Sequence, residues 1–401
     1  MRARTDSGAL DRTVSPSPGF DAPARAARLK ITQVRLVSLK TAREVGSLEP
    51  AWDQGGRMTF RVGGGTYLEV HTDQGLVGIG PALDESLLRT VNEQLAGKDP
   101  FDVEAHAARL DYFGGRRARG GTSSVDIALW DLIGKASGQP LYRLWGGGKE
   151  KVVAYASAIR LSSPGRAASL AVQLLEEGWK AIKLRLHHET FEEDVLTAEA
   201  VRAAVGDRMA IMADPNQAQS PSSWQPGVRW DLPRAVTTAR ELERLGVRWL
   251  EEPLPRYAFD ELRALSAAVD IPIAGGEGNS GLHEFGWMME RDVYDIYQPD
   301  CRVSGGITEL RAIAALARAF GKRVVPHHGG GSLGTIAHLH LVASWPHAPY
   351  VELLHEPPVG SYRHRLAIFR DPPTLDADGH LPVPQGPGLG VEIDPDLIED
   401  A

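Results

Sequence analysis

The stretch that decides the fold is "KAIKLRLHH", residues 180–188. Apolar side chains at 182, 184 and 186 alternate with Lys183, Arg185 and His187, which is the two-residue period of a β-strand. Burying unpaired charge is costly, so the face that carries these cations must meet either solvent or an anionic partner.

Short apolar runs of this kind recur eight times between residues 152 and 354, and amphipathic helical patterns separate most of them. The runs are "VVAYASAI" (152–159), "KAIKLRL" (180–186), "MAIMADP" (209–215), "VRWLEEP" (247–253), "IPIAGGE" (271–277), "YDIYQPD" (294–300), "RVVPHH" (323–328) and "YVELL" (350–354). Strand–helix alternation predicts a parallel sheet, and eight strands favour a closed (β/α) barrel of the TIM type. No Gly-x-Gly-x-x-Gly follows the first strand, which disfavours a dinucleotide-binding fold.

Polar residues stand at or near the carboxyl end of seven of these runs. They are Lys183, Arg185, Asp214, Glu251, Glu252, Glu277, Asp300, His327, His328 and Glu352. The carboxyl ends of barrel strands meet on one face, where active sites are built. The sequence therefore predicts a polar site at that face.

Composition narrows the class of protein. The 401 residues carry 42% hydrophobic and 24% charged residues, which is ordinary for a globular protein. The net charge of −8 argues against nucleic acid or an anionic membrane as a partner. A single cysteine, Cys301, excludes an internal disulfide and is compatible with a cytoplasmic location. No apolar run is long enough to predict a membrane span.

Three acids from consecutive runs, Asp214, Glu251 and Glu277, are expected to converge in the barrel. Three carboxylates can share a small volume only if a cation neutralises them, and all-oxygen ligation selects Mg²⁺ first and Mn²⁺ second. The alternative is that each acid pairs with a neighbouring lysine or arginine.

Asp300 and His327 come from adjacent runs and can form a carboxylate–imidazole dyad. The second imidazole nitrogen is then free for acid or base chemistry near neutral pH. His328 competes for this role, whereas His338 and His340 are expected to be ordinary helix residues.

The two cations of the second run are expected to face a carboxylate substrate bound at the metal. There they can stabilise the charge that develops when a proton leaves the α-carbon. Lys183 is expected to have a lowered pKa beside a metal and Arg185. Arg185 is a poor base and a good anion clamp.

These motifs, in this order, resemble the enolase superfamily in its mandelate racemase/muconate lactonizing enzyme branch. "SSVDIALWDLIGKASGQPLYRLWGG" (123–147) is similar to that branch's junction between cap and barrel, and "PDCRVSGGIT", "VVPHHGG" and "PGLGVEI" follow as in the family. The likeness runs from about residue 29 to about residue 393. It implies a (β/α)7β barrel (148–369), an α+β capping domain (29–147) and a C-terminal segment (370–401) that returns to the cap. Residues 1–28 are expected to be a disordered leader.

The resemblance also implies roles for particular residues. It assigns the metal to Asp214, Glu251 and Glu277, with Glu252 outside the ligand set, and proton transfer to the His327–Asp300 dyad. Glu352 would contact the substrate carboxylate, and Asn216 would line the site. The family's shared step is removal of the α-proton of a carboxylate with Mg²⁺, and its members commonly assemble as dimers or octamers.

One departure from the family pattern bears on the reaction. Many members carry Lys-x-Lys on the second strand, where the second lysine is a base, but here that position is Arg185. A racemase needs two bases, whereas His327 alone, supplemented by Lys183, can run a β-elimination. We therefore expect dehydration of a sugar acid to a 2-keto-3-deoxy acid. A racemase or epimerase of a hydroxy or amino acid is the first alternative, and a non-catalytic metal-binding barrel is the second.

Two segments of the cap are expected to close over the site and select the substrate. One is the glycine-rich segment "GSLEPAWDQGGRMTFRVGGGT" (46–66), predicted to be a mobile loop, and the other is "YFGGRRARGG" (112–121). A solvated loop is the alternative for each.

Overall fold

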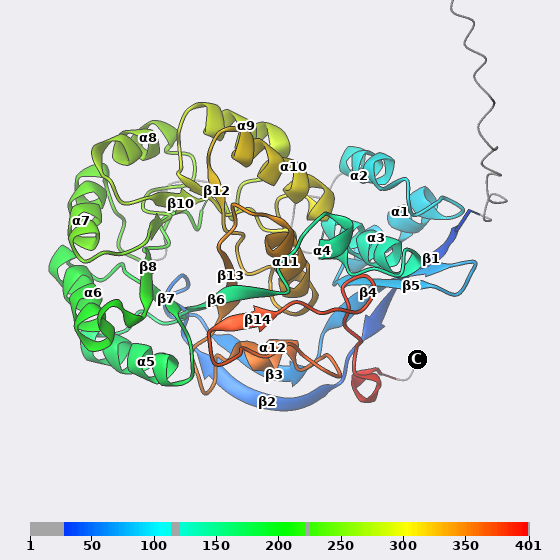
Figure 1. The fold of residues 1–401 in the computed structure, drawn as a ribbon, viewed down its shortest axis with the longest axis horizontal. Coiled ribbons are helices and arrows are strands. Elements are labelled where there is room, and N and C mark those ends of the chain that lie inside the picture. Colours follow the sequence, from blue (N-terminus) through cyan, green and yellow to red (C-terminus); the bar gives the residue numbers. More distant parts are fainter. Residues whose placement is uncertain (1–27, 114–120, 221–223, 226, 400–401) are drawn as a thin grey trace, which may run out of the picture.

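The computed structural model describes residues 28–113, 121–220, 224–225 and 227–399. Within these residues, eight parallel strands form a curled sheet, and helices cover its outer face (Figure 1). The strands are β6 (Lys151–Ser157), β7 (Ala181–Arg185), β8 (Ala210–Asp214), β9 (Leu250–Glu251), β10 (Ile273–Gly275), β11 (Ile296–Tyr297), β12 (Arg323–Val324) and β13 (Tyr350–Leu354). All eight predicted runs are therefore strands, in the predicted order.

The strands follow one another around the sheet in sequence order from β6 to β12. The last strand, β13, pairs in parallel with the first, with Tyr350 opposite Val153, so the sheet curls back on itself. Within the described residues, β12 and β13 are neighbours without a hydrogen-bonded ladder. This topology confirms the predicted barrel architecture.

Amphipathic helices connect the strands and cover the barrel (Figure 1). They are α5 (Pro164–Glu176), α6 (Phe191–Val205), α7 (Leu232–Arg244), α8 (Phe259–Ala268), α9 (Leu282–Glu290), α10 (Gly306–Ala319) and α11 (Ser332–Ser344), and a 3-10 turn (Gly206–Arg208) follows α6. The start of α6 is fixed by a capping box, in which Thr190 and Glu193 satisfy each other's backbone N–H groups.

Strand β7 answers the question that its sequence raised. Ile182 and Leu184 face the helical layer and belong to the large core, whereas Ala181 belongs to a separate cluster inside the barrel. That inner cluster takes residues from every part of the ring: Tyr155, Ala181, Met212, Trp249, Ala274, Ile296 and Val325. Because side chains alternate along a strand, Lys183 and Arg185 also point inward, above this apolar inner cluster. Both cations are buried, so they must face anions rather than solvent.

The N-terminal part of the chain forms a cap beside the barrel (Figure 1). Strands β1 (Ile31–Ser38), β4 (Thr66–Thr72) and β5 (Val77–Pro81) form an antiparallel sheet, and β2 (Thr41–Leu48) pairs with β3 (Met58–Gly63). Helices α1 (Glu85–Leu95), α2 (Val103–Tyr112), α3 (Ser123–Ala136) and α4 (Leu141–Leu144) complete it. A hairpin around residues 73–75 joins β4 to β5, and Gly75 supplies the positive φ of its turn.

The glycine-rich segment 46–66 is not one loop, and that prediction was wrong in part. Residues Met58–Gly63 form β3, because Met58, Phe60 and Val62 can alternate against the partner strand β2. A loop remains from Glu49 to Arg57. The other predicted cap loop, 112–121, and the predicted leader, 1–28, fall almost wholly outside the described residues.

Polar contacts fasten the cap to the barrel. Asp126 on α3 accepts hydrogen bonds from the backbone N–H and the hydroxyl of Thr308 on α10, and Trp130 donates to the same hydroxyl. The C-terminal part contains α12 (Tyr362–Leu366), β14 (His380–Pro382) and a 3-10 turn (Pro395–Leu397). It contacts the barrel, where β14 pairs with β6, and the cap, where Lys40 N–H donates to Leu397.

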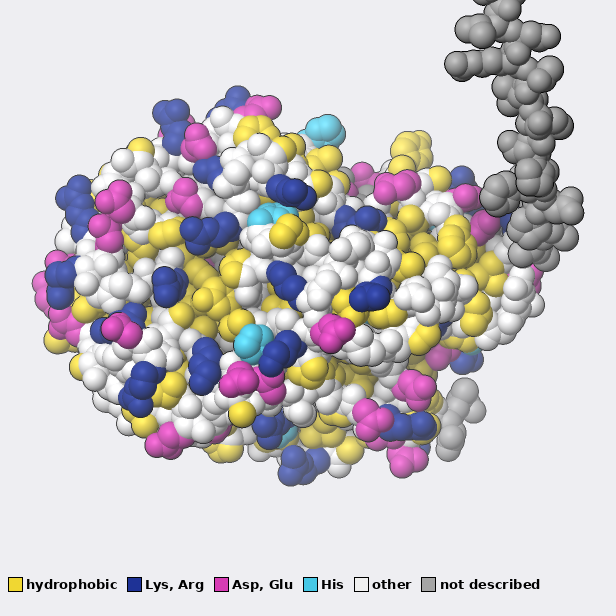
Figure 2. All heavy atoms as spheres, in the orientation of Figure 1, with side chains coloured by type: hydrophobic (Ala, Val, Ile, Leu, Met, Phe, Trp, Pro, Cys, Tyr) yellow, Lys and Arg dark blue, Asp and Glu magenta, His cyan; other side chains and the backbone are white. Residues whose placement is uncertain are grey.

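Among the described residues, every helix is too short or too polar to cross a bilayer. On the face shown in Figure 2, Lys and Arg side chains are scattered among Asp and Glu side chains. No single basic surface is gathered on that face.

Candidate active site

Lys183 lies at the centre of a buried cluster of acids. Its Nζ is 2.9 Å from Glu352 and 3.4 Å from Asp214, and it also donates a hydrogen bond to Glu251. These acids come from β13, β8 and β9, whose carboxyl ends adjoin that of β7 or face it across the barrel. The anionic partner that the sequence required is therefore, in this structure, the protein itself.

The expectation of a lowered pKa for Lys183 was wrong for this arrangement. Burial alone would lower it, but the charges of Glu251, Glu352 and Asp214 outweigh burial and raise the pKa of Lys183. The prediction considered the repulsion of Lys183 by Arg185 and by a metal. It did not include Glu352, which is an acid outside the three predicted metal ligands. Although burial opposes it, Lys183 in turn lowers the pKa of Glu352.

Arg185 is held on every side. Its guanidinium pairs with Asp214, and it donates to the Ser157 hydroxyl at 2.8 Å and to the Ala158 carbonyl at 2.8 Å. The ring of Trp52, from the cap loop, covers it with 4.8 Å between ring centroid and guanidinium carbon. Because arginine stays charged and this one is fully engaged, it can bind an anion but is a poor base.

The predicted ligands do not converge on one point in this structure. Asp214 and Glu251 meet at Lys183, whereas Glu277, two residues beyond β10, places Oε2 3.3 Å from Nε2 of His327. In this structure Asp214 and Glu251 pair with a lysine, as the alternative interpretation held for each acid, whereas Glu277 pairs with a histidine.

The donor set nevertheless fits a hard divalent cation. Burial, with the charges of Glu251 and Glu277, raises the pKa of Asp214 even though Arg185 and Lys183 lower it. Four acids, Asp214, Glu251, Glu277 and Glu352, stand around two permanent cations, Lys183 and Arg185, and every donor is an oxygen.

Glu251 is oriented by two residues that the sequence did not single out. Gln298 on the β11 side donates to Oε2 at 2.6 Å, and the indole N–H of Trp249 donates to the same oxygen at 3.1 Å. Gln298 stands on the inward face with Ile296 and Asp300, so strand alternation alone could have found it. Glu252 is also buried, and burial with the charges of Glu277 and Asp214 raises its pKa.

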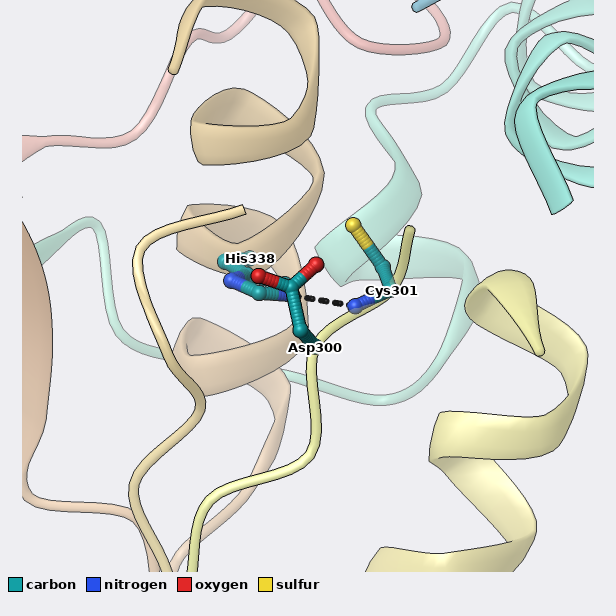
Figure 3. A group of neighbouring side chains, drawn as sticks. All are labelled: Asp300, Cys301 and His338. Atoms are coloured by element: carbon teal, nitrogen blue, oxygen red, sulfur yellow. Dashed lines mark hydrogen bonds between the residues drawn. The ribbon is translucent and has the colours of Figure 1, made fainter. Parts of the chain in front are cut away.

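Another group of potential ligands lies nearby, and its histidine already accepts a hydrogen bond. Asp300, Cys301 and His338 are the one set of three in the described chain whose ligand atoms all lie within 4.8 Å of one another (Figure 3). His338 Nε2 accepts the backbone N–H of Cys301 at 2.9 Å, so its lone pair is used. Burial raises the pKa of the Cys301 thiol, which disfavours the thiolate that a metal needs. We therefore interpret this group as structural, as expected for His338.

The dyad is present in the geometry that the sequence predicted. His327 Nδ1 lies 2.7 Å from Asp300 Oδ2, and Asp300 also accepts the backbone N–H groups of Arg302 and Gly329. Burial alone would lower it, but the charge of Glu277 and the hydrogen bond to Asp300 raise the pKa of His327 to about 9. The competitor, His328, accepts the Gly330 N–H at Nδ1, and burial and the neighbouring imidazole lower its pKa. His327 is thus the better placed of the two.

A cavity of about 180 Å³ opens above these groups. Five predicted site residues line it: Arg185, Asn216, Glu277, Asp300 and His327. The other four, Lys183, Asp214, Glu251 and Glu352, lie outside its lining and are buried. Trp52 and Met58 from the cap complete the wall, so the predicted approach of the first cap loop is observed. Arg302 and Arg365 also line it and were missed, although Arg302 belongs to the quoted motif "PDCRVSGGIT".

Asn216 supports the polar end of this cavity. Its backbone N–H donates to Asp214 Oδ1 at 2.8 Å, its side-chain N–H donates to Asp214 Oδ2, and its oxygen is 3.4 Å from Arg185. The residue has a positive φ of 52°, which asparagine tolerates better than most residues. Asn216 therefore fixes the acid that Arg185 also contacts.

Two family models match the chain. The model described as "Mandelate racemase / muconate lactonizing enzyme, N-terminal domain" matches residues 57–146, and the model described as "Enolase C-terminal domain-like" matches residues 166–397. Together they cover most of the cap and of the barrel, without β1, β2 and β6.

Curated proteins and solved structures agree with these matches. Arabinonate dehydratase of Saccharolobus solfataricus is 30% identical over 83% of this chain and 89% of its own length. D-galactarolactone cycloisomerase of Agrobacterium fabrum is 31% identical over 83% of this chain and 90% of its own. The structure of D-glucarate dehydratase from Agrobacterium tumefaciens complexed with magnesium is 27% identical and superposes with a TM-score of 0.79 over 93% of this chain and all of that chain (100%). The dehydratases among the relatives support an enzyme of that class.

Proposed function

Because the chain belongs to the enolase superfamily, in its mandelate racemase and muconate lactonizing enzyme branch, we propose that it is a magnesium-dependent dehydratase of a sugar acid. The enzyme removes the α-proton of the acid and eliminates the β-hydroxyl group, which yields a 2-keto-3-deoxy acid. The observation that supports this proposal most directly is the 2.7 Å hydrogen bond between His327 and Asp300 in the wall of the cavity. The same wall holds Arg185 in place of the second base that a racemase would need.

His327 is the base of this scheme. Nδ1 is committed to Asp300, so Nε2 is the nitrogen that takes the α-proton. It does so as the neutral imidazole, and because the pKa of His327 is raised to about 9, we expect turnover to rise with pH up to that range. The imidazolium that results is stabilised by Asp300. The same proton then protonates the β-hydroxyl, which leaves as water, so one residue serves both steps and returns to its starting state.

The substrate carboxylate binds where Arg185, Asn216 and Glu277 line the cavity. Asp214, Glu251 and Glu277 would hold Mg²⁺, and the ion, when bound, supplies positive charge that offsets charge developing on the substrate carboxylate. Arg185 contributes a permanent positive charge in the same wall, and Lys183 adds a second from beneath. Trp52 and Met58 of the cap help to exclude water from this end.

A racemase requires a second base on the other face of the α-carbon, and the surroundings of the two cations disfavour one. Arg185 is engaged by Asp214, Ser157 and Ala158. Lys183 pairs with Glu251, Glu352 and Asp214 and does not line the cavity, so its amine is not presented to the α-carbon. The hydrogen-bonded His327–Asp300 dyad beside an open cavity favours an enzyme over a non-catalytic barrel.

A substrate screen tests the proposal. The protein with Mg²⁺ is incubated with a panel of aldonic and aldaric acids, and 2-keto product is detected as its semicarbazone by absorbance. We expect turnover of at least one acid, and loss of turnover in His327→Asn. Exchange of an α-proton for deuterium without elimination would favour the racemase, and no reaction with any acid would favour the non-catalytic barrel.

The names of the relatives leave the class of acid open. Arabinonate carries one carboxylate, whereas glucarate carries two. The choice between them must come from residues of this chain.

A further inference from the structure

A second cavity of about 370 Å³ adjoins the catalytic one, between the cap and the loop that follows β12. The two cavities share Arg302, Gly330 and Arg365 in their walls. Arg185, Asn216 and Glu277 line only the catalytic cavity. The shared residues therefore mark the junction, on the side away from the metal ligands.

The lining of the second cavity is one-sided in charge. Arg61, Arg302 and Arg365 line it together with His364, and no aspartate or glutamate is among its described lining residues. This is unexpected in a chain with a net charge of −8. The acids of the catalytic cavity do not compensate, because Glu277 and Asp300 both face His327.

Arg302 is positioned but not neutralised. Within the described chain no carboxylate forms an ion pair with it, and its buried Nε has no hydrogen-bond partner. Its guanidinium lies against Gly330, where an added Cβ would come within 2.6 Å of Nη1. Arg365 lies against Gly331 and over the ring of Phe60, 5.3 Å from the ring centroid, and its guanidinium donates to the Gly330 carbonyl at 3.4 Å. The loop glycines thus allow two guanidinium groups to approach the same junction.

We propose that this junction binds a second anionic group, at the end of the sugar acid distal to the reacting carboxylate. The inference rests on the proposed function and names the substrate class: a sugar acid with a terminal carboxylate or phosphate rather than a neutral hydroxymethyl end. Guanidinium groups bind both anions through paired N–H donors, which explains why arginine is used here. The reacting carboxylate lies at Arg185 and the metal ligands, and the distal anion lies at Arg302 and Arg365.

Kinetics on matched substrates test this inference. Aldonic acids, the corresponding aldaric acids and 6-phosphoaldonic acids of one stereochemical series are compared by kcat/KM with the Mg²⁺-loaded enzyme. A charge-assisted contact of about 1.5–3 kcal/mol corresponds to a preference of roughly 10- to 150-fold for a doubly anionic acid. Whichever of the aldaric and 6-phosphoaldonic acids has the higher kcat/KM identifies the distal anion as a carboxylate or a phosphate.

Arg302→Gln should reduce that preference by the same order, and Arg302→Lys should retain part of it. Arg363→Gln is the matched control, because Arg363 is exposed on the same helix as Arg365 and lines neither cavity. The wild-type ratio needs no variant, so a variant that fails to fold leaves the test intact.

Each result decides the inference. A preference for doubly anionic acids that Arg302→Gln removes and Arg363→Gln keeps supports it. Turnover of aldonic acids at least as fast as their doubly anionic counterparts, or a preference that survives Arg302→Gln, overturns it while the dehydratase stands. If no acid of any class is dehydrated, the proposed function fails and this inference fails with it.

Discussion

Replacing Asp300 by asparagine tests the dyad with the smallest change in shape. Oδ2 of Asp300 accepts from His327 at 2.7 Å and from the Gly329 N–H at 3.2 Å, and Oδ1 accepts the Arg302 N–H at 2.8 Å. An asparagine must place its NH₂ group at one of these two positions. In either orientation it meets at least one donor, so Asp300→Asn cannot satisfy the whole network.

The expected effect on catalysis follows from these contacts. The variant loses a charge-assisted hydrogen bond to the imidazolium, about 1.5–3 kcal/mol, or roughly 10- to 150-fold in rate. If the NH₂ group faces His327, the imidazole also shifts to the tautomer with the proton on Nε2, which removes the base. A change of this kind costs ~10⁴-fold in a serine protease. We therefore expect kcat to fall by about 10- to 10⁴-fold, depending on the orientation of the amide, with little change in KM.

Steady-state kinetics with the best acid from the screen, alongside circular dichroism, measures this. Cys301→Ser is the matched control, since Cys301 is the buried neighbour of Asp300 and lines neither cavity. A folded Asp300→Asn enzyme within threefold of the wild-type kcat would refute the role of the dyad. Equal losses in both variants would mean that packing, rather than the carboxylate charge, explains the effect.

Four further outcomes are expected. Chelation with EDTA should abolish turnover and Mg²⁺ should restore it, and Asp214→Asn should weaken Mg²⁺ binding in calorimetry; unchanged affinity would exclude Asp214 as a ligand. Glu356→Ala should lower the free energy of unfolding by about 2–4 kcal/mol in urea melts, because this buried acid accepts the N–H groups of Ile159 and Arg160; a loss below 1 kcal/mol would contradict this. Trp52→Ala should raise KM for the acid by uncovering Arg185, with unfolding unchanged. Burial lowers the pKa of His340 to about 4, so the unfolded state binds one more proton than the folded state between about pH 6.5 and 4. The free energy of unfolding should therefore fall by up to ~1.4 kcal/mol per pH unit as the pH drops through this range. His340→Gln should flatten this slope, and the exposed control His283→Gln should not.

Most of the fold could be predicted from the two-residue period of the strands and from their order along the sequence. The alternation in β7 predicted which side chains face inward, and the inner cluster from Tyr155 to Val325 shows the same alternation around the ring. The error in segment 46–66 has a physical cause. Its glycines suggested a loop, but β3 pairs with β2, the strand that precedes the loop 49–57, and the residues of β3 alone do not record this pairing.

Most residues of the site could be predicted from the sequence, but several of the contacts between them could not. The dyad was found because a histidine and an acid ended adjacent strands. The pairing of Lys183 with Glu352 was missed because those strands are far apart in sequence and face each other only when the barrel closes. Arg365 was missed because it lies on α12, outside the strand ends. The metal, the oligomeric state and the cytoplasmic location stay predictions.

One measurement tests the central claim most directly. The enzyme, Mg²⁺ and its acid are mixed in D₂O, and the products are followed by proton NMR. The account predicts a 2-keto-3-deoxy acid with one deuterium at C3, formed by the wild-type enzyme and not by folded His327→Asn. The same product from His327→Asn, or an α-deuterated acid that never loses its β-hydroxyl, would contradict it.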